Sequence, residues 1–163
     1  EQPMQYSHRL HAGELGMDCR YCHANVEQSA EAMIPPTQTC MGCHNVVRPE
    51  SPALAPVRES FASGQSVEWV RVHKVPDHVF FDHSVHLAVG VGCVSCHGRI
   101  DQMEVVRIDQ PISMAWCLDC HRNPEPNLRP LDQITNMAQE RFPDFESEVA
   151  SLNPPTHCSG CHR

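Results

Sequence analysis

Apolar residues in this 163-residue chain form short groups, and neither a helical nor a strand period is sustained for long. Fourteen prolines and eight glycines interrupt them, so long helices or a broad sheet are not expected. Ser51-Pro52 is typical of a helix start, which predicts a short helix over about 52–62 that ends at Gly64. Residues 67–72 alternate and predict a short extended segment, and Leu131 to Glu140 predicts another helix.

Ten cysteines occur, and each belongs to a Cys-x-x-Cys pair that a histidine follows directly. This is the attachment signature of c-type haem, because two thiols at this spacing add to the two vinyl groups on one edge of the macrocycle. The next histidine then reaches the iron as proximal ligand. We therefore expect five covalent haems c. Their attachment residues are Cys19, Cys22, Cys40, Cys43, Cys93, Cys96, Cys117, Cys120, Cys158 and Cys161, and their proximal ligands are His23, His44, His97, His121 and His162.

Other uses of paired cysteines fit less well. The first two pairs are separated by 17 residues and the next two by 20, as in zinc ribbons, but zinc leaves the fifth pair without a partner. Zinc also gives no reason for a histidine after every pair. A disulfide framework would scatter its cysteines, and a thioredoxin-like redox pair needs one motif in a βαβ context.

The net charge and the chain length exclude some classes of protein and indicate what fills the interior. The formal net charge of −8 argues against nucleic acid, which requires a basic face. No apolar run of bilayer length occurs, and no signal-peptide pattern opens the sequence. A chain of this size buries a modest apolar core unaided, so the haems would supply most of it. The expected fold is a multihaem cytochrome c with short α-helices and coil wrapped round a haem core and little β structure.

An internal repeat organises the chain. Tyr6-Ser7-His8-Arg9-Leu10-His11 and Phe81-Asp82-His83-Ser84-Val85-His86 share the pattern aromatic-x-His-x-x-His, about 75 residues apart, and each precedes two haem motifs. We expect one pentahaem domain over 1–163. Within it, 1–48 is a first dihaem unit, 49–77 a linker, 78–126 a second dihaem unit and 127–163 a monohaem segment.

Five irons need distal ligands. Two histidines three residues apart project from one side of a helical turn, so each repeated segment can serve two neighbouring haems. We predict His8, His11, His83 and His86 as distal ligands, with His73 as the fifth and Met137 as the substitute thioether. His78 and His157 are expected to be ordinary side chains. All five irons would then be six-coordinate, which leaves no position for a substrate.

With these motifs in view, the sequence resembles the pentahaem cytochrome subunit of bacterial alternative complex III over nearly its whole length. The repeated segments also look like those of class III cytochromes of the c3/c7 type. The stretches that carry the resemblance are Tyr6–His11, Leu15–His23, Ile34–Thr37, Arg71–His73, Pro76–Asp77, Phe81–His86, Trp116–Pro124, Asn136–Met137 and Cys158–Arg163. The resemblance implies that His8 and His83 ligate haems of their own units, and that His11 and His86 ligate neighbouring haems. It also favours His73 and Met137 as ligands.

The function that follows is electron transfer without catalysis. The resemblance implies a cytochrome subunit of a quinol-oxidising respiratory or photosynthetic membrane complex, which works with the other subunits and a periplasmic electron acceptor. Covalent haem attachment and the oxidising compartment predict a periplasmic location, with membrane association through an anchor or partner subunits. Two alternatives stay open: a soluble, low-potential periplasmic shuttle, and a multihaem reductase with one open haem.

Overall fold

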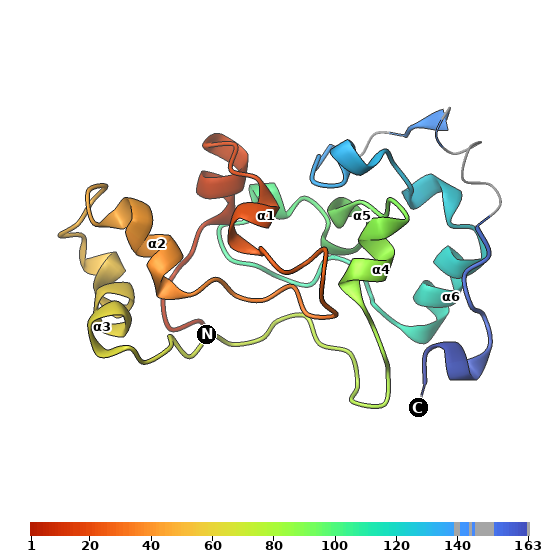
Figure 1. Ribbon diagram of the computed structural model, residues 1–163, viewed down its shortest axis with the longest axis horizontal. Coiled ribbons are helices and arrows are strands. Elements are labelled where there is room, and N and C mark those ends of the chain that lie inside the picture. The colour runs from red at the N-terminus through yellow and green to blue at the C-terminus, as the bar shows by residue number, and fades with distance from the viewer. Residues whose placement is uncertain (139–140, 144, 146–151, 163) are drawn as a thin grey trace.

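The computed structural model describes residues 1–138, 141–143, 145 and 152–162, and short helices joined by coil make up this part of the chain (Figure 1). The described residues contain no strand, only two isolated antiparallel bridges, Val79 with His162 and Val91 with Leu128. The prediction of short helices and coil with little β structure is therefore confirmed. The helices that carry cysteine motifs are α1 (Cys19–Cys22), α2 (Thr37–His44), α5 (Cys93–His97), α6 (Met114–Arg122) and η6 (Cys158–Gly160).

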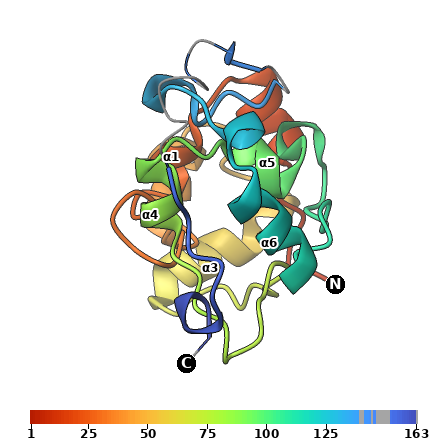
Figure 2. The same cartoon turned by 90° about the vertical axis from the view of Figure 1, so that its right-hand side faces the viewer.

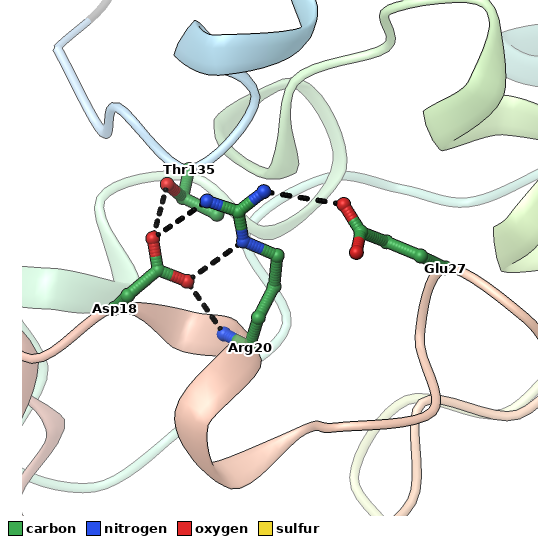
Figure 3. A network of polar contacts seen from close by, with 4 residues as sticks. All are labelled: Asp18, Arg20, Glu27 and Thr135. Carbon is green, nitrogen blue, oxygen red and sulfur yellow. Dashed lines mark hydrogen bonds and ion pairs between the residues drawn. The ribbon is translucent and has the colours of Figure 1, made fainter.

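Side-chain caps start several of these helices. The Asp18 carboxylate accepts a hydrogen bond from the Arg20 backbone N–H at 2.8 Å and so begins α1. Asp18 also accepts from the Arg20 guanidinium and from the Thr135 hydroxyl, and Arg20 reaches Glu27 (Figure 3). Ser113 caps α6 through its hydroxyl. The network around Asp18 thus ties the first motif to a segment more than a hundred residues later.

The two predicted helices had different outcomes. The helix after Ser51 is confirmed: η2 (Pro52–Leu54) leads into α3 (Ala55–Ser63), which ends at Gly64 with φ of +72°. The helix over 131–140 is wrong for its described residues, because only the 3-10 turn η5 (Leu131–Gln133) forms. The Asn136 side chain accepts from the Ala138 N–H, and this local bond competes with helical hydrogen bonding. Residues 139–140 lie outside the described residues.

The segment 67–72 does not belong to a strand. The Gln2 side-chain amide bonds the N–H of Val70 at 3.0 Å and its carbonyl at 2.8 Å, which are the two bonds a neighbouring strand would have made. The amino-terminal coil therefore lies against this segment, and an alternating pattern was not sufficient to form a sheet.

The two repeated segments form different helices. Residues after His8 form a π-helix, η1 (Arg9–Glu14), whereas the second repeat forms α4 (His83–Ala88), which Asp82 caps. The π-helix packs on η3 (Ile100–Gln102), where the Arg9 N–H donates to the Met103 carbonyl at 3.0 Å. Gly13 allows this approach, since a Cβ there would lie 2.3 Å from the Asp101 carbonyl oxygen.

The apolar core of the described chain is thin. Its buried hydrophobic residues are Val26, Val57, Leu87, Val94, Met103, Leu128, Ile134 and Met137. Many large apolar side chains remain exposed, and η4 (Glu125–Asn127) and the long coils contribute little packing. Seen along the long axis, helices and coil surround the middle of the molecule (Figure 2). None of the described helices has the length and hydropathy needed to cross a bilayer.

Candidate functional site

A continuous cavity of about 1690 Å³ runs through the described part of the molecule. It is well above the volume of about 300–1,000 Å³ typical of a ligand pocket, and close-packed interiors leave no such space unless a bulky group fills it. Cysteines of all five motifs line it: Cys19, Cys22, Cys40, Cys93, Cys96, Cys117, Cys120, Cys158 and Cys161. The cavity therefore has the size and the reactive lining that several covalently attached macrocycles require.

Each motif presents its thiols on one helical turn. In α1 and α5, residues three and four positions apart lie on the same side of the helix. Both cysteines of a motif and the histidine that follows them therefore lie toward the same space. All ten cysteines are free of disulfides. Among the described residues, no three His, Cys, Asp or Glu side chains converge as a bare metal ion would need. The donor set fits haem, in which the porphyrin supplies four ligands and the protein two.

Three distal candidates face a proximal histidine. The ring centres are 6.2 Å apart for His11 and His44, 6.4 Å for His83 and His97, and 6.1 Å for His86 and His121. Two imidazoles that bind one iron through bonds of about 2 Å have ring centres about 6 Å apart. Each of these pairs therefore has the spacing of two axial ligands to one iron.

Two further pairs concern the first and fifth motifs. His8 is close enough to His23 to interact with it electrostatically. His78 and His162 have ring centres 5.5 Å apart with planes inclined by 22°. His78 was expected to be an ordinary side chain, yet it is the histidine that lies next to the fifth motif.

Backbone carbonyls fix most of these rings. When the Nδ1–H donates to a carbonyl, Nε2 keeps its lone pair and is the nitrogen available to a metal. Six such contacts of 2.6–2.9 Å join His11 to Ser7, His23 to Met33, His44 to Val47, His83 to Ala30, His86 to Asp82 and His121 to Pro155. The rings are thus oriented for Nε2 ligation by the fold itself.

Burial keeps several of these imidazoles neutral. It lowers the pKa of His8 and of His97 to about 4, and nearby histidines add to the effect. Burial also lowers the pKa of His86. A neutral imidazole is the form that ligates iron, so these side chains are ready ligands at neutral pH.

Two predicted ligands, His73 and Met137, do not belong to these histidine pairs. The His73 ring is 4.6 Å from the His97 ring, too close for an iron between them, and its Nε2 is buried with no hydrogen-bond partner in the described chain. Met137 is buried, and the Ile134 carbonyl three residues earlier accepts a hydrogen bond from the Cys93 N–H of the third motif. His157 is exposed. The ligand roles of His73 and Met137 stay predictions.

Residues 79–163, slightly more than half of the chain, match the family model described as cytochrome c7 and related cytochrome c. The chain belongs to this family. The cytochrome is thus a multihaem electron-transfer protein with covalent haem c, in line with its paired histidines and its cysteine-lined cavity. The family match spans the second dihaem unit and the carboxy-terminal motif.

The cytochrome is also similar to a curated relative. It is 39% identical over 98 residues to the protein named menaquinone reductase, multiheme cytochrome c subunit, of Nitratidesulfovibrio vulgaris (strain Hildenborough). The match covers 60% of this chain and 46% of that protein, so the chain spans about half the length of the relative.

The structure brings one histidine that sequence reasoning set aside, His78, beside a proximal histidine. It belongs to no repeated segment, and its neighbour His162 follows 84 residues later, so no local spacing could mark it. One signal was available: the fifth motif lacks a preceding aromatic-x-His-x-x-His segment, so a candidate partner for His162 had to be sought outside the repeats.

Proposed function

We propose that this cytochrome conducts electrons through five haems c, as the cytochrome subunit of a quinol-oxidising membrane complex similar to alternative complex III. The observation that carries the proposal is the continuous cavity lined by cysteines of all five motifs. Because the motifs open into one space, neighbouring macrocycles would lie edge to edge or face to face. Such spacing makes a chain of cofactors a conductor.

Contacts between cysteines support an order for the proposed haems. The Cys19 and Cys93 side chains lie close enough to interact, which brings the first motif next to the third. Cys22 interacts electrostatically with Cys40, which joins the first to the second. Attachment edges that meet in this way hold the first haem between the second and the third.

The remaining contacts between cysteines add the fourth and fifth motifs to this order. Cys96 interacts with Cys117 and Cys120 of the fourth motif, and Cys117 with Cys161 of the fifth. Helices α2, α1, α5 and α6 follow in the same order along the molecule (Figure 1). The spatial order is second, first, third, fourth, fifth. The two ends of the wire are the haems of Cys40/Cys43 and Cys158/Cys161.

The ligand set supports transfer without catalysis. Imidazoles on both sides of an iron leave no exchangeable position and give lower potentials than methionine ligation. We propose His8, His11, His83 and His86 as distal ligands on the pair geometry and on the matching repeats. Residues 1–163 would form one domain in which the two dihaem units share the cavity.

Location and partners follow from the chemistry and the relative. We propose a periplasmic location, because covalent haem attachment in bacteria occurs on the outer side of the cytoplasmic membrane. The relative's printed name associates it with menaquinone. The proposed donor is accordingly a quinol-oxidising partner subunit, and the acceptor a periplasmic redox protein.

Two measurements test the proposal. Intact-protein mass and a pyridine haemochrome assay should report five covalent haems, and fewer would disprove the five-haem wire. A tagged chain should then be recovered from detergent-solubilised membranes with proteins that reduce its haems when quinol is added. Recovery only in the soluble fraction, with no quinol-dependent reduction, would instead favour the shuttle.

A further inference from the structure

The segment around His78 is hydrogen-bonded directly to the fifth motif. Val79 and His162 form an antiparallel bridge, and the Phe80 N–H donates to the Cys161 carbonyl at 2.8 Å. This backbone pairing, of which the Phe80 bond is part, brings the residues before the second repeat against the fifth motif. His78 is therefore positioned by backbone pairing beside the last proximal histidine.

The two rings face each other at nearly the spacing of the other pairs. Their centres are 5.5 Å apart, about 0.6 Å less than for His86 and His121. Both side chains line the common cavity. The His162 Nδ1 lies 3.4 Å from the His78 carbonyl oxygen, and Nδ1 is also the nitrogen that contacts a carbonyl in His23, His44 and His121, so the His162 Nε2 is the nitrogen left for iron.

Other donors are already committed or distant from the fifth motif. His11, His83 and His86 each face a different proximal ring, and His8 interacts with His23. His73 packs on His97, and the stretch before Met137 is bonded to Cys93. His157 adjoins Cys158, so it is poorly placed to reach the far side of a haem attached at that cysteine.

We propose that His78 is the distal ligand of the fifth haem, so that this haem at one end of the wire is also bis-histidine ligated. The assignment rests on the proposed five-haem function and completes its ligand set without Met137 or His73. It has a functional consequence. A bis-histidine terminal haem has a low potential and no open position, so the electron leaves to a partner protein and not to a small molecule bound at that iron.

The test uses the full-length holoprotein with His78→Ala, and His157→Ala as the matched control beside the same motif. Electron paramagnetic resonance of the oxidised protein and carbon monoxide binding to the reduced protein report the coordination. We expect about one high-spin haem and about one bound carbon monoxide per chain in His78→Ala, with added imidazole restoring the low-spin signal. His157→Ala should behave as the parent protein.

His78→Met covers the case in which the alanine variant does not accumulate. If His78 binds the iron, the methionine variant keeps all haems six-coordinate, gains the long-wavelength absorption band of a thioether-ligated haem and raises one potential. A variant with every haem attached, entirely low-spin spectra and no new band would overturn the assignment. Mass spectrometry distinguishes a wrong His78 assignment from a wrong five-haem proposal. If the five-haem proposal is wrong, the parent protein itself carries fewer than five haems.

Discussion

The two proposed dihaem units arrange the rings of their repeated segments in the same way on different helices. In the first unit the Tyr6 ring stacks on His11 at 4.6 Å and meets His8 edge-on at 4.8 Å. In the second, Phe81 stacks on His86 at 4.6 Å and meets His83 edge-on at 4.7 Å. Yet the first segment continues into a π-helix and the second into an α-helix.

One extra residue explains the difference. Eight positions separate His11 from Cys19, and seven separate His86 from Cys93. A π-helix takes up an inserted residue within a helix, as the Leu15 N–H bond to the Leu10 carbonyl shows. The π-helix begins at Arg9, inside the repeated segment, yet the ring arrangement around Tyr6 matches that around Phe81. The units therefore match in what haem ligation demands and differ where it does not.

The units also differ in how their motifs are held. In the second unit, Val94 is 3% exposed and His97 is well buried at the centre of the proposed wire. In the first, α2 contains no buried residue, and its His44 is oriented by the nearby Val47 carbonyl. The second unit should therefore be the structural centre, and α2 a terminal element.

Removing one haem from each unit should give the largest effect. Cys93→Ala with Cys96→Ala removes the proposed central haem and should abolish end-to-end electron transfer and most thermal stability. Cys40→Ala with Cys43→Ala should leave four connected haems and a milder loss. Intact mass gives the number of haems and thermal unfolding gives the stability. The rate of haem reduction reports electron transfer. Equal losses of transfer in the two variants would show that the proposed order is wrong.

Removing the first histidine of each repeat should have matching, smaller effects. His8→Ala and His83→Ala should each open one iron, produce a high-spin signal and raise one potential, with all haems still attached. Covalent attachment survives because the cysteines are untouched. Electron paramagnetic resonance and redox titration give the result. A high-spin haem in only one variant would break the equivalence of the units.

Much of this site could be predicted from the sequence because haem attachment and its repeats are local patterns. The five motifs, the short helices and the choice of His11, His83 and His86 as candidate ligands depend on spacings of a few residues, whereas their partners in the structure lie 14 to 35 residues away. The order of the haems did not follow, since the Cys19–Cys93 contact is set by tertiary placement. His78 was missed for the same reason. The helix predicted at 131–140 was wrong because side-chain bonding at Asn136 outweighed propensity.

Exchanging a glycine and an alanine between the units should give an effect of intermediate size. Gly13 and Ala88 each stand five residues after the first repeat histidine. Gly13→Ala would press a methyl group on the Asp101 carbonyl and should destabilise by roughly 1–3 kcal/mol. Ala88→Gly should cost only about 0.5–1 kcal/mol of helix propensity. Denaturant unfolding of the holoproteins compares them, and equal costs would contradict the close approach of η1 to η3.

The smallest expected effect concerns the side-chain cap of α1, which the corresponding helix α5 lacks. Asp18 begins α1 with its carboxylate, whereas Gly92 begins α5 without a side-chain cap. The hydrogen bonds from Arg20 lower the pKa of Asp18 to about 2. A carboxyl with a depressed pKa adds stability above its ordinary value of 3.8, and this contribution is lost as the pH falls through about 2.

Asp18→Asn tests this contribution, because asparagine caps a helix as well as aspartate but carries no charge. The pair is partly exposed, so the variant should lose only about 0.2–1 kcal/mol at neutral pH. The difference from the parent protein should shrink between pH 4 and pH 2 in thermal unfolding followed across that range. Thr135→Val removes the hydroxyl contact and keeps the Arg20 pair, so it should retain most of the pH dependence. A stability difference for Asp18→Asn that stays constant with pH would show that the Arg20 pair does not stabilise the first motif.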